Sequence, residues 1–135
     1  MLLAYDITLP AGGSSGSLTS AEVKYPPGIV RRVIVIVPDG CADLVRLHIR
    51  KNIHKLWPLN EDGYFRGNDA RYEIEEELEL TDPPHELVLE GWNEDDTYEH
   101  TLLVYLVIEP LPPPAAISFE DLIRAQVAAN AGVAL

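Results

Sequence analysis

The chain of 135 residues is 47% hydrophobic and 24% charged, which is enough for one domain with a buried core and excludes a wholly disordered protein. Its 22 acidic and 10 basic residues give a formal net charge of −12, and so acidic a surface repels phosphate backbones, which argues against nucleic-acid binding. No stretch approaches the ~20 apolar residues of a membrane span, and the first ten residues do not resemble a signal peptide, so we expect a protein made in a cytoplasm and independent of membranes.

Apolar and polar residues alternate along most of the chain, which is the period of a strand with one buried face. The run "VRLHIR" at 45–50 places three aliphatic side chains on one face, and two arginines and a histidine on the other. The run "RRVIVIV" at 31–37 is nearly continuous in β-branched residues, as expected of a strand covered on both faces. Turns rich in Pro, Gly, Asp and Asn separate these runs. We predict strands near residues 2–9, 17–25, 29–37, 43–50, 53–57, 70–80, 85–92 and 98–109.

Eight short strands with no helix between them predict an all-β fold in residues 1–109. The regular spacing favours an antiparallel two-sheet sandwich, and eight is the strand count of a jelly roll. An immunoglobulin-like sandwich is the nearest alternative, but the Cys and Trp spacing of that fold is missing.

The pattern changes after residue 109. Residues 110–117 form a Pro-rich segment that predicts a semi-rigid extended spacer. In residues 118–135 we predict a short C-terminal α-helix, which begins at the N-cap Ser118 and carries Phe119, Ile123 and Val127 on one face. Such a short helix is marginal alone, so we expect it to be a docking tail.

The stretch "GWNEDDTYEH" at 91–100 gathers four carboxylates beside two aromatic residues and a histidine. Its acidic residues are Glu94, Asp95, Asp96 and Glu99. The consecutive acids and the missing central Gly do not fit the calcium loop of an EF-hand. We therefore favour a hairpin loop with its carboxylates in water, and adventitious Ca²⁺ binding at 93–99 stays open as the alternative.

Candidate catalytic and metal-ligating residues are sparse. Cys41 has no activating neighbour in sequence, and we expect a small buried hydrophobe. The metal site of the cupins, enzymes built on a jelly roll, needs a His-x-His pair, which the chain lacks. We expect surface or rim positions for the four histidines, His48, His54, His85 and His100. We therefore predict no catalytic, cofactor-binding or metal-ligating residue, and no enzyme.

Glu76 breaks the alternation of its predicted strand. It falls on the apolar face of Tyr72 and Leu78, where an unpaired carboxylate costs several kcal/mol. Either a bulge turns Glu76 outward, or it meets an arginine of its own chain or of another subunit.

The last predicted strand is apolar on both faces. Leu102, Val104, Leu106 and Ile108 lie on one face, and Leu103, Tyr105 and Val107 lie on the other. Only one face of a strand can point into a two-layer core, so the C-terminal segment or another subunit must cover the second face. We predict interface residues on the last strand and on the predicted helix, namely Leu103, Tyr105, Val107, Phe119, Ile123 and Val127.

Three segments together resemble small jelly-roll proteins of tailed viruses of bacteria and archaea. They are "VRRVIVIVPDGCADLVRLHIRK" at 30–51, "LWPLNEDGYFRG" at 56–67 and "LVLEGWNEDDTYEHTLLVYLVI" at 87–108. The resemblance implies a structural protein of the virion, either a head decoration protein or another minor capsid protein. It implies no catalytic residue.

We therefore expect a non-enzymatic virion protein on the capsid surface. Its partners would be copies of itself, with a trimer ahead of a pentamer, and the major capsid protein or other virion proteins. The alternative is a carbohydrate- or ligand-binding sandwich that stacks its ligand on Trp57, Tyr64, Trp92 and Tyr98.

Overall fold

The structure is a computed structural model that describes residues 1–60 and 63–111. All eight predicted strands are present, and their ends differ from the prediction by at most two residues. The strands are β1 (Leu2–Leu9), β2 (Thr19–Lys24), β3 (Gly28–Val37), β4 (Val45–Lys51), β5 (His54–Trp57), β6 (Ala70–Leu80), β7 (Glu86–Asn93) and β8 (His100–Pro110). The described residues contain no helix, and so none that could cross a membrane. The predicted helix, with Phe119, Ile123 and Val127, lies outside the described residues.

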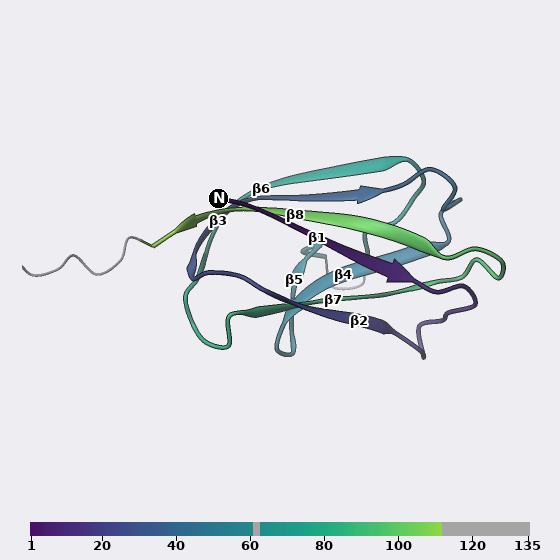
Figure 1. The fold of residues 1–135 in the computed structure, drawn as a ribbon, viewed down its shortest axis with the longest axis horizontal. Coiled ribbons are helices and arrows are strands. Elements are labelled where there is room, and N and C mark those ends of the chain that lie inside the picture. Colours follow the sequence, from purple (N-terminus) through teal and green to yellow (C-terminus); the bar gives the residue numbers. More distant parts are fainter. Residues whose placement is uncertain (61–62, 112–135) are drawn as a thin grey trace, which may run out of the picture.

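The strands form two antiparallel sheets of four, which confirms the predicted all-β sandwich. The first sheet has the order β1-β8-β3-β6 and the second the order β2-β7-β4-β5. The sheets lie one above the other, with the N-terminus and the end of β8 at one end of the sandwich (Figure 1). The β1–β2 and β7–β8 loops lie at the opposite end.

The core lies between the sheets and follows the predicted alternation. Val45, Leu47 and Ile49 of β4 are fully buried, as the period-two pattern requires. One face of β8 contributes Leu102, Val104, Leu106 and Ile108, each at most 1% exposed. Burial of each such side chain stabilises the fold by about 1.5–3 kcal/mol.

An irregular register between β3 and β6 changes the expected surroundings of Glu76. Val30 pairs with Leu78, but Arg32 pairs with Glu75, so the pairing shifts beside Glu76. Glu76 nevertheless stays half-buried. Its Oε1 accepts a hydrogen bond from the indole Nε1 of Trp57 at 3.0 Å. The irregularity therefore does not turn Glu76 outward, and that expectation was wrong. Within the chain its partner is a tryptophan, and an arginine of another subunit stays a prediction.

Candidate functional site

The second face of β8 lies on the outside of its sheet, together with apolar side chains of β1 and β3. Cross-strand pairing places these residues on one surface, which we call the outer face. Its apolar members are Leu2, Ala4, Ile34, Ile36, Leu103, Tyr105 and Val107. Most of them are half-buried, and Leu2 is 62% exposed. The outer face therefore contains the predicted interface residues of β8, and β3 extends it.

Charged and hydroxyl side chains border the outer face. On β6, Arg71 forms a salt bridge with Glu73 at 2.7 Å. At the end of the sandwich nearer the N-terminus, Arg31 pairs with Glu109 at 2.7 Å. At the other end, the hydroxyls of Thr8 and Thr101 are hydrogen-bonded at 2.8 Å. An apolar centre within a polar border is the arrangement of a protein–protein interface.

Tyr105 stands between two hollows of the outer face. A hollow of about 220 Å³ is lined by Leu2, Ile34, Ile36, Arg71 and Tyr105. A second, of about 340 Å³, lies at the edge of the sheet along β1 and is lined by Ala4, Tyr5, Asp6, Val23, Leu103 and Tyr105. The small side chain of Ala4, opposite Tyr105, leaves part of this space. The outer face is therefore uneven and can receive protruding side chains.

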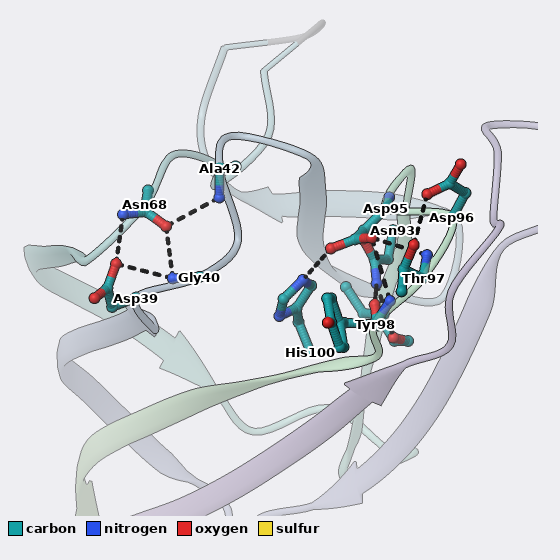
Figure 2. Close-up of polar contacts among 11 residues, drawn as sticks. Asp39, Gly40, Ala42, Asn68, Asn93, Asp95, Asp96, Thr97, Tyr98 and His100 are labelled. Atoms are coloured by element: carbon teal, nitrogen blue, oxygen red, sulfur yellow. Dashed lines mark hydrogen bonds and ion pairs between the residues drawn. The ribbon is translucent and has the colours of Figure 1, made fainter.

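The acidic loop between β7 and β8 is ordered by one of its own carboxylates, Asp95. Asp95 Oδ1 accepts hydrogen bonds from the backbone N–H groups of Thr97 and Tyr98 at 2.9 and 3.2 Å. Its Oδ2 pairs with His100 Nε2 at 2.9 Å, as Figure 2 shows. The side chains of Asp95 and His100 are only 13% and 10% exposed. The expectation that all these carboxylates face water was therefore wrong for Asp95.

The hydrogen bonds to Asp95 favour its charged form. The backbone N–H of Thr97 contributes most, followed by the ring of His100 and the N–H of Tyr98, and together they lower the pKa of the Asp95 carboxyl. Asp95 thus closes the loop as an anion.

Asn93, a residue that sequence reasoning passed over, holds the same loop from inside. It is fully buried. Its Nδ2 donates to the carbonyls of Leu9 and Tyr98 at 3.2 and 2.8 Å, and its Oδ1 accepts the N–H of Asp95 at 2.9 Å. Its backbone carbonyl accepts the N–H of Gly13, which binds the β1–β2 loop as well. The sequence offers only a weak signal for this role, an asparagine directly after the predicted strand 85–92. In the structure Gly91, Trp92 and Asn93 are all buried.

A second polar network lies beside this loop (Figure 2). Asn68 Oδ1 accepts the backbone N–H groups of Gly40 and Ala42 at 2.8 and 2.9 Å, and its Nδ2 donates to Asp39 at 2.9 Å. These contacts join the β3–β4 loop to the segment before β6. Within residues 1–60 and 63–111, no three His, Cys, Asp or Glu side chains converge as metal ligands would. The contacts of Asn68 fix the two loops against each other.

Two of the four histidines, His48 and His100, pair with carboxylates. Besides His100, His48 is only 14% exposed and pairs with Glu90 at 2.9 Å. Arg50 and Ser20 also bind Glu90, at 3.2 and 3.1 Å. Burial alone would raise the pKa of the Glu90 carboxyl, but the hydrogen bonds from Arg50, His48 and Ser20 lower it overall. His54 is exposed, and His48, His85 and His100 are half-buried, which agrees with the expected surface or rim positions. His48 and His100 each contact a carboxylate in addition.

The four aromatic residues proposed as a ligand platform do not share a surface. Trp57 is fully buried and cannot stack on a ligand, whereas Tyr98 is 68% exposed in the acidic loop. Tyr64 stacks on the His48 ring at 5.4 Å and meets the edge of Trp92 at 4.9 Å. The rings of His48, Tyr64 and Trp92 therefore pack on one another and do not form an open stacking platform.

Cys41 is a buried side chain, as predicted. It is 0% exposed. Burial, followed by the nearby carboxylates of Asp95 and Asp39, raises the pKa of its thiol. A protonated, enclosed thiol is a poor nucleophile.

Compared with models of known protein families and with curated proteins, the chain matches none. Its function therefore has to be inferred from its own residues.

Proposed function

We propose that the chain is a non-enzymatic structural protein of a virion, a capsid decoration or minor capsid protein that acts by assembly. The outer face carries this proposal. Tyr105 and its neighbours form an apolar surface on the solvent side of a sheet whose other side already packs in the core. An apolar surface with polar borders is suited to binding another protein, and it lacks the convergent polar groups of a small-molecule site.

The strand order supports the finer fold that this role implies. In the orders β1-β8-β3-β6 and β2-β7-β4-β5, the first strand lies beside the last and the second beside the seventh. Two interlocked Greek keys give eight strands this order, so we propose a jelly roll. Jelly rolls are common in viral capsids, which agrees with the motif resemblance at 30–51, 56–67 and 87–108.

The carbohydrate-binding alternative has less support. Its platform would need exposed, unstacked aromatic faces, but Trp57 is buried and Tyr64 is stacked on His48. The neighbouring carboxylate of Glu90 is already bound by three side chains. A sugar would have to displace these contacts.

We propose that attachment to the capsid uses the segment beyond β8. Leu111 donates its N–H to the Pro27 carbonyl at 3.2 Å, so the chain leaves the sandwich at the end opposite the acidic loop. The Pro-rich spacer would then carry Phe119, Ile123 and Val127 to a groove on the capsid or on an adjacent copy. In this arrangement the acidic loop points away from the capsid, and a trimer remains the first expectation for copies on the lattice.

Particle incorporation tests the proposal. Particles grown without the gene should regain the chain when it is supplied in trans, and the chain should co-sediment with the major capsid protein on a density gradient. A chain lacking residues 115–135 should keep its β-type circular dichroism but remain at the top of the gradient. If the full-length chain never co-sediments with particles, the virion role is wrong. Normal incorporation of the truncated chain would refute attachment through the tail alone.

A further inference from the structure

The strand register arranges the outer face in rows that run across the sheet. In one row, Asp6 pairs with Leu103, Leu103 with Ile36, and Ile36 with Arg71. An acid therefore stands at the β1 edge, a base stands at the β6 edge, and two aliphatic side chains lie between them. The neighbouring row repeats the apolar centre with Tyr105 and Ile34.

This row is complementary to itself. A two-fold axis parallel to the strands, between β8 and β3, would place β1 of one copy opposite β6 of the other and β8 opposite β3. Asp6 would then face Arg71 of the second copy, and Leu103 would face Ile36. A two-fold axis across the strands would instead place β1 opposite β1 and β6 opposite β6. Asp6 would then face β1 of the second copy, which has no basic residue. Only the first operation brings opposite charges together at both edges.

We infer that the outer face binds the outer face of a second copy of this chain, through a two-fold axis parallel to the strands. The inference rests on the self-assembly part of the proposed function and specifies its contact. Tyr105 of each copy stands opposite Ile34 of the other, beside the hollow bounded by Leu2 and Arg71. Aligned packing of two sheets turns the strands by about 30°. The length of the Arg71 side chain accommodates the resulting offset.

The charges suit this pairing. Within the described part of the chain Asp6 forms no salt bridge, whereas Arg71 holds an exposed one with Glu73. Two Asp6–Arg71 contacts would therefore add a partner for each Asp6. Arg71 must keep its bond to Glu73 at the same time, because the same operation places Glu73 opposite Ala4. The next row places Val107 opposite Arg32, whose methylene stem can lie over the apolar side chain at the periphery.

The size of the face predicts how strong the contact is. Four strands about 4.8 Å apart and about 3.4 Å per residue outline a face of roughly 20 Å by 27 Å, on the order of 500 Å² per partner. Stable complexes bury about 800 Å² per partner, so this contact is reversible and dissociates on dilution. A two-fold contact is also compatible with the expected trimer, because two trimers joined face to face have D3 symmetry.

Charge reversal tests the register with the full-length chain. Asp6→Arg sets two arginines against each other, and Arg71→Asp sets two carboxylates against each other. Each single variant should weaken association about tenfold or more in sedimentation velocity, and the double variant D6R/R71D should return to within about threefold of the wild type. Glu22→Arg on the other sheet makes the same charge change and should leave association unaltered. A double variant as weak as the singles would overturn the pairing.

Cross-linking tests the same geometry without relying on charge. Facing sheets lie about 10 Å apart, which is too far for a disulfide but within reach of a short reagent that links two thiols. Such a reagent should join D6C/R71C into a covalent dimer, while D6C alone and R71C alone should stay monomeric. A monomer at every concentration, with no cross-link, would overturn the inference.

The outcome is separable from the virion role. Dimerisation of a chain that never joins particles supports the contact and refutes the virion role. If the chain joins particles but stays monomeric and does not cross-link, the virion role is supported and the two-fold contact is refuted.

Discussion

The indole Nε1 of Trp57 and the Oε1 of Glu76, 3.0 Å apart, join the two sheets along one open side of the sandwich. Trp57 ends β5, the edge strand of one sheet, and Glu76 lies in β6, the edge strand of the other. On the opposite open side, the Tyr5 hydroxyl donates to the Lys24 carbonyl at 2.5 Å and joins β1 to β2. Each open side thus has a side-chain hydrogen bond between the sheets.

Removing the Glu76 carboxylate should destabilise the fold. Glu76→Ala leaves the buried Trp57 N–H without its acceptor, which should lower the free energy of unfolding by about 1–3 kcal/mol. Glu76→Gln keeps an acceptor oxygen and should cost less. Urea unfolding measures both variants against Glu79→Ala, an exposed change on the same strand that should stay within about 0.5 kcal/mol of the wild type. Equal losses for the two alanine variants would mean that the Trp57 contact contributes nothing.

Replacing Asn93 should be the more damaging change in the acidic loop. Asn93→Ala leaves the Leu9 and Tyr98 carbonyls and the Asp95 N–H without their partner, so we expect a loss of about 2–4 kcal/mol. Asn93→Asp should cost at least as much at neutral pH, because its charge would face two carbonyl oxygens. Thermal unfolding gives the comparison, with the exposed Asp96→Ala as control. Similar melting of Asn93→Ala and Asp96→Ala would contradict the structural role.

Asp95 should make the loop sensitive to acid. Its pKa is lower in the folded protein than its ordinary value near 3.9, so the unfolded chain takes up the proton first as pH falls. The stability that the charge provides is therefore complete above about pH 4 and is lost as pH falls through the folded pKa. Asp95→Asn should melt below the wild type at pH 7, and the gap should close in acid. If the difference in melting temperature between the two proteins is constant from pH 7 to pH 3, the charge of Asp95 does not contribute to stability.

The strands could be predicted because local alternation determines them. In β4 and β8 the period-two pattern identifies both the strand and its buried face, and Val45 and Leu102 are buried accordingly. Glu76 could not be placed in this way, because its partner Trp57 is 19 positions away in sequence and meets it only after the sheets pack. The charge complementarity of Asp6 and Arg71 likewise depends on the order β1-β8-β3-β6, which strand prediction alone does not supply.

The acidic loop shows the same limit. Composition suggested solvated carboxylates in 93–99, but it could not distinguish Asp95 from Asp96. Asp95 is turned inward by backbone donors of Thr97 and Tyr98 and by His100, and their positions depend on the path of the loop. Fully buried Asn93 gave only a weak signal, since asparagine is common in exposed turns.

Calcium should not stabilise the protein. Both oxygens of Asp95 already accept hydrogen bonds, and Asp96 Oδ1 accepts one from the Thr97 hydroxyl at 2.9 Å. A metal ion would have to displace these donors. Melting temperatures in excess Ca²⁺ and in chelator should therefore agree within about a degree or two. If Ca²⁺ raises the melting temperature of the wild type by several degrees but not that of Asp95→Asn, the loop is a Ca²⁺-binding site and this prediction is wrong.

Adjacent residues of β8 should respond in opposite ways to the same substitution. Val104 points into the core and is 1% exposed, so Val104→Asp buries an unpaired charge and should unfold the chain. Tyr105 points outward between two hollows, so Tyr105→Asp should keep the β-type circular dichroism while it weakens association by at least about tenfold. Leu103→Asp should behave like Tyr105→Asp. Circular dichroism and sedimentation velocity on the same samples separate folding from association. If Tyr105→Asp unfolds the chain as Val104→Asp does, the outer face is covered within one protomer, and contact between copies must use another surface.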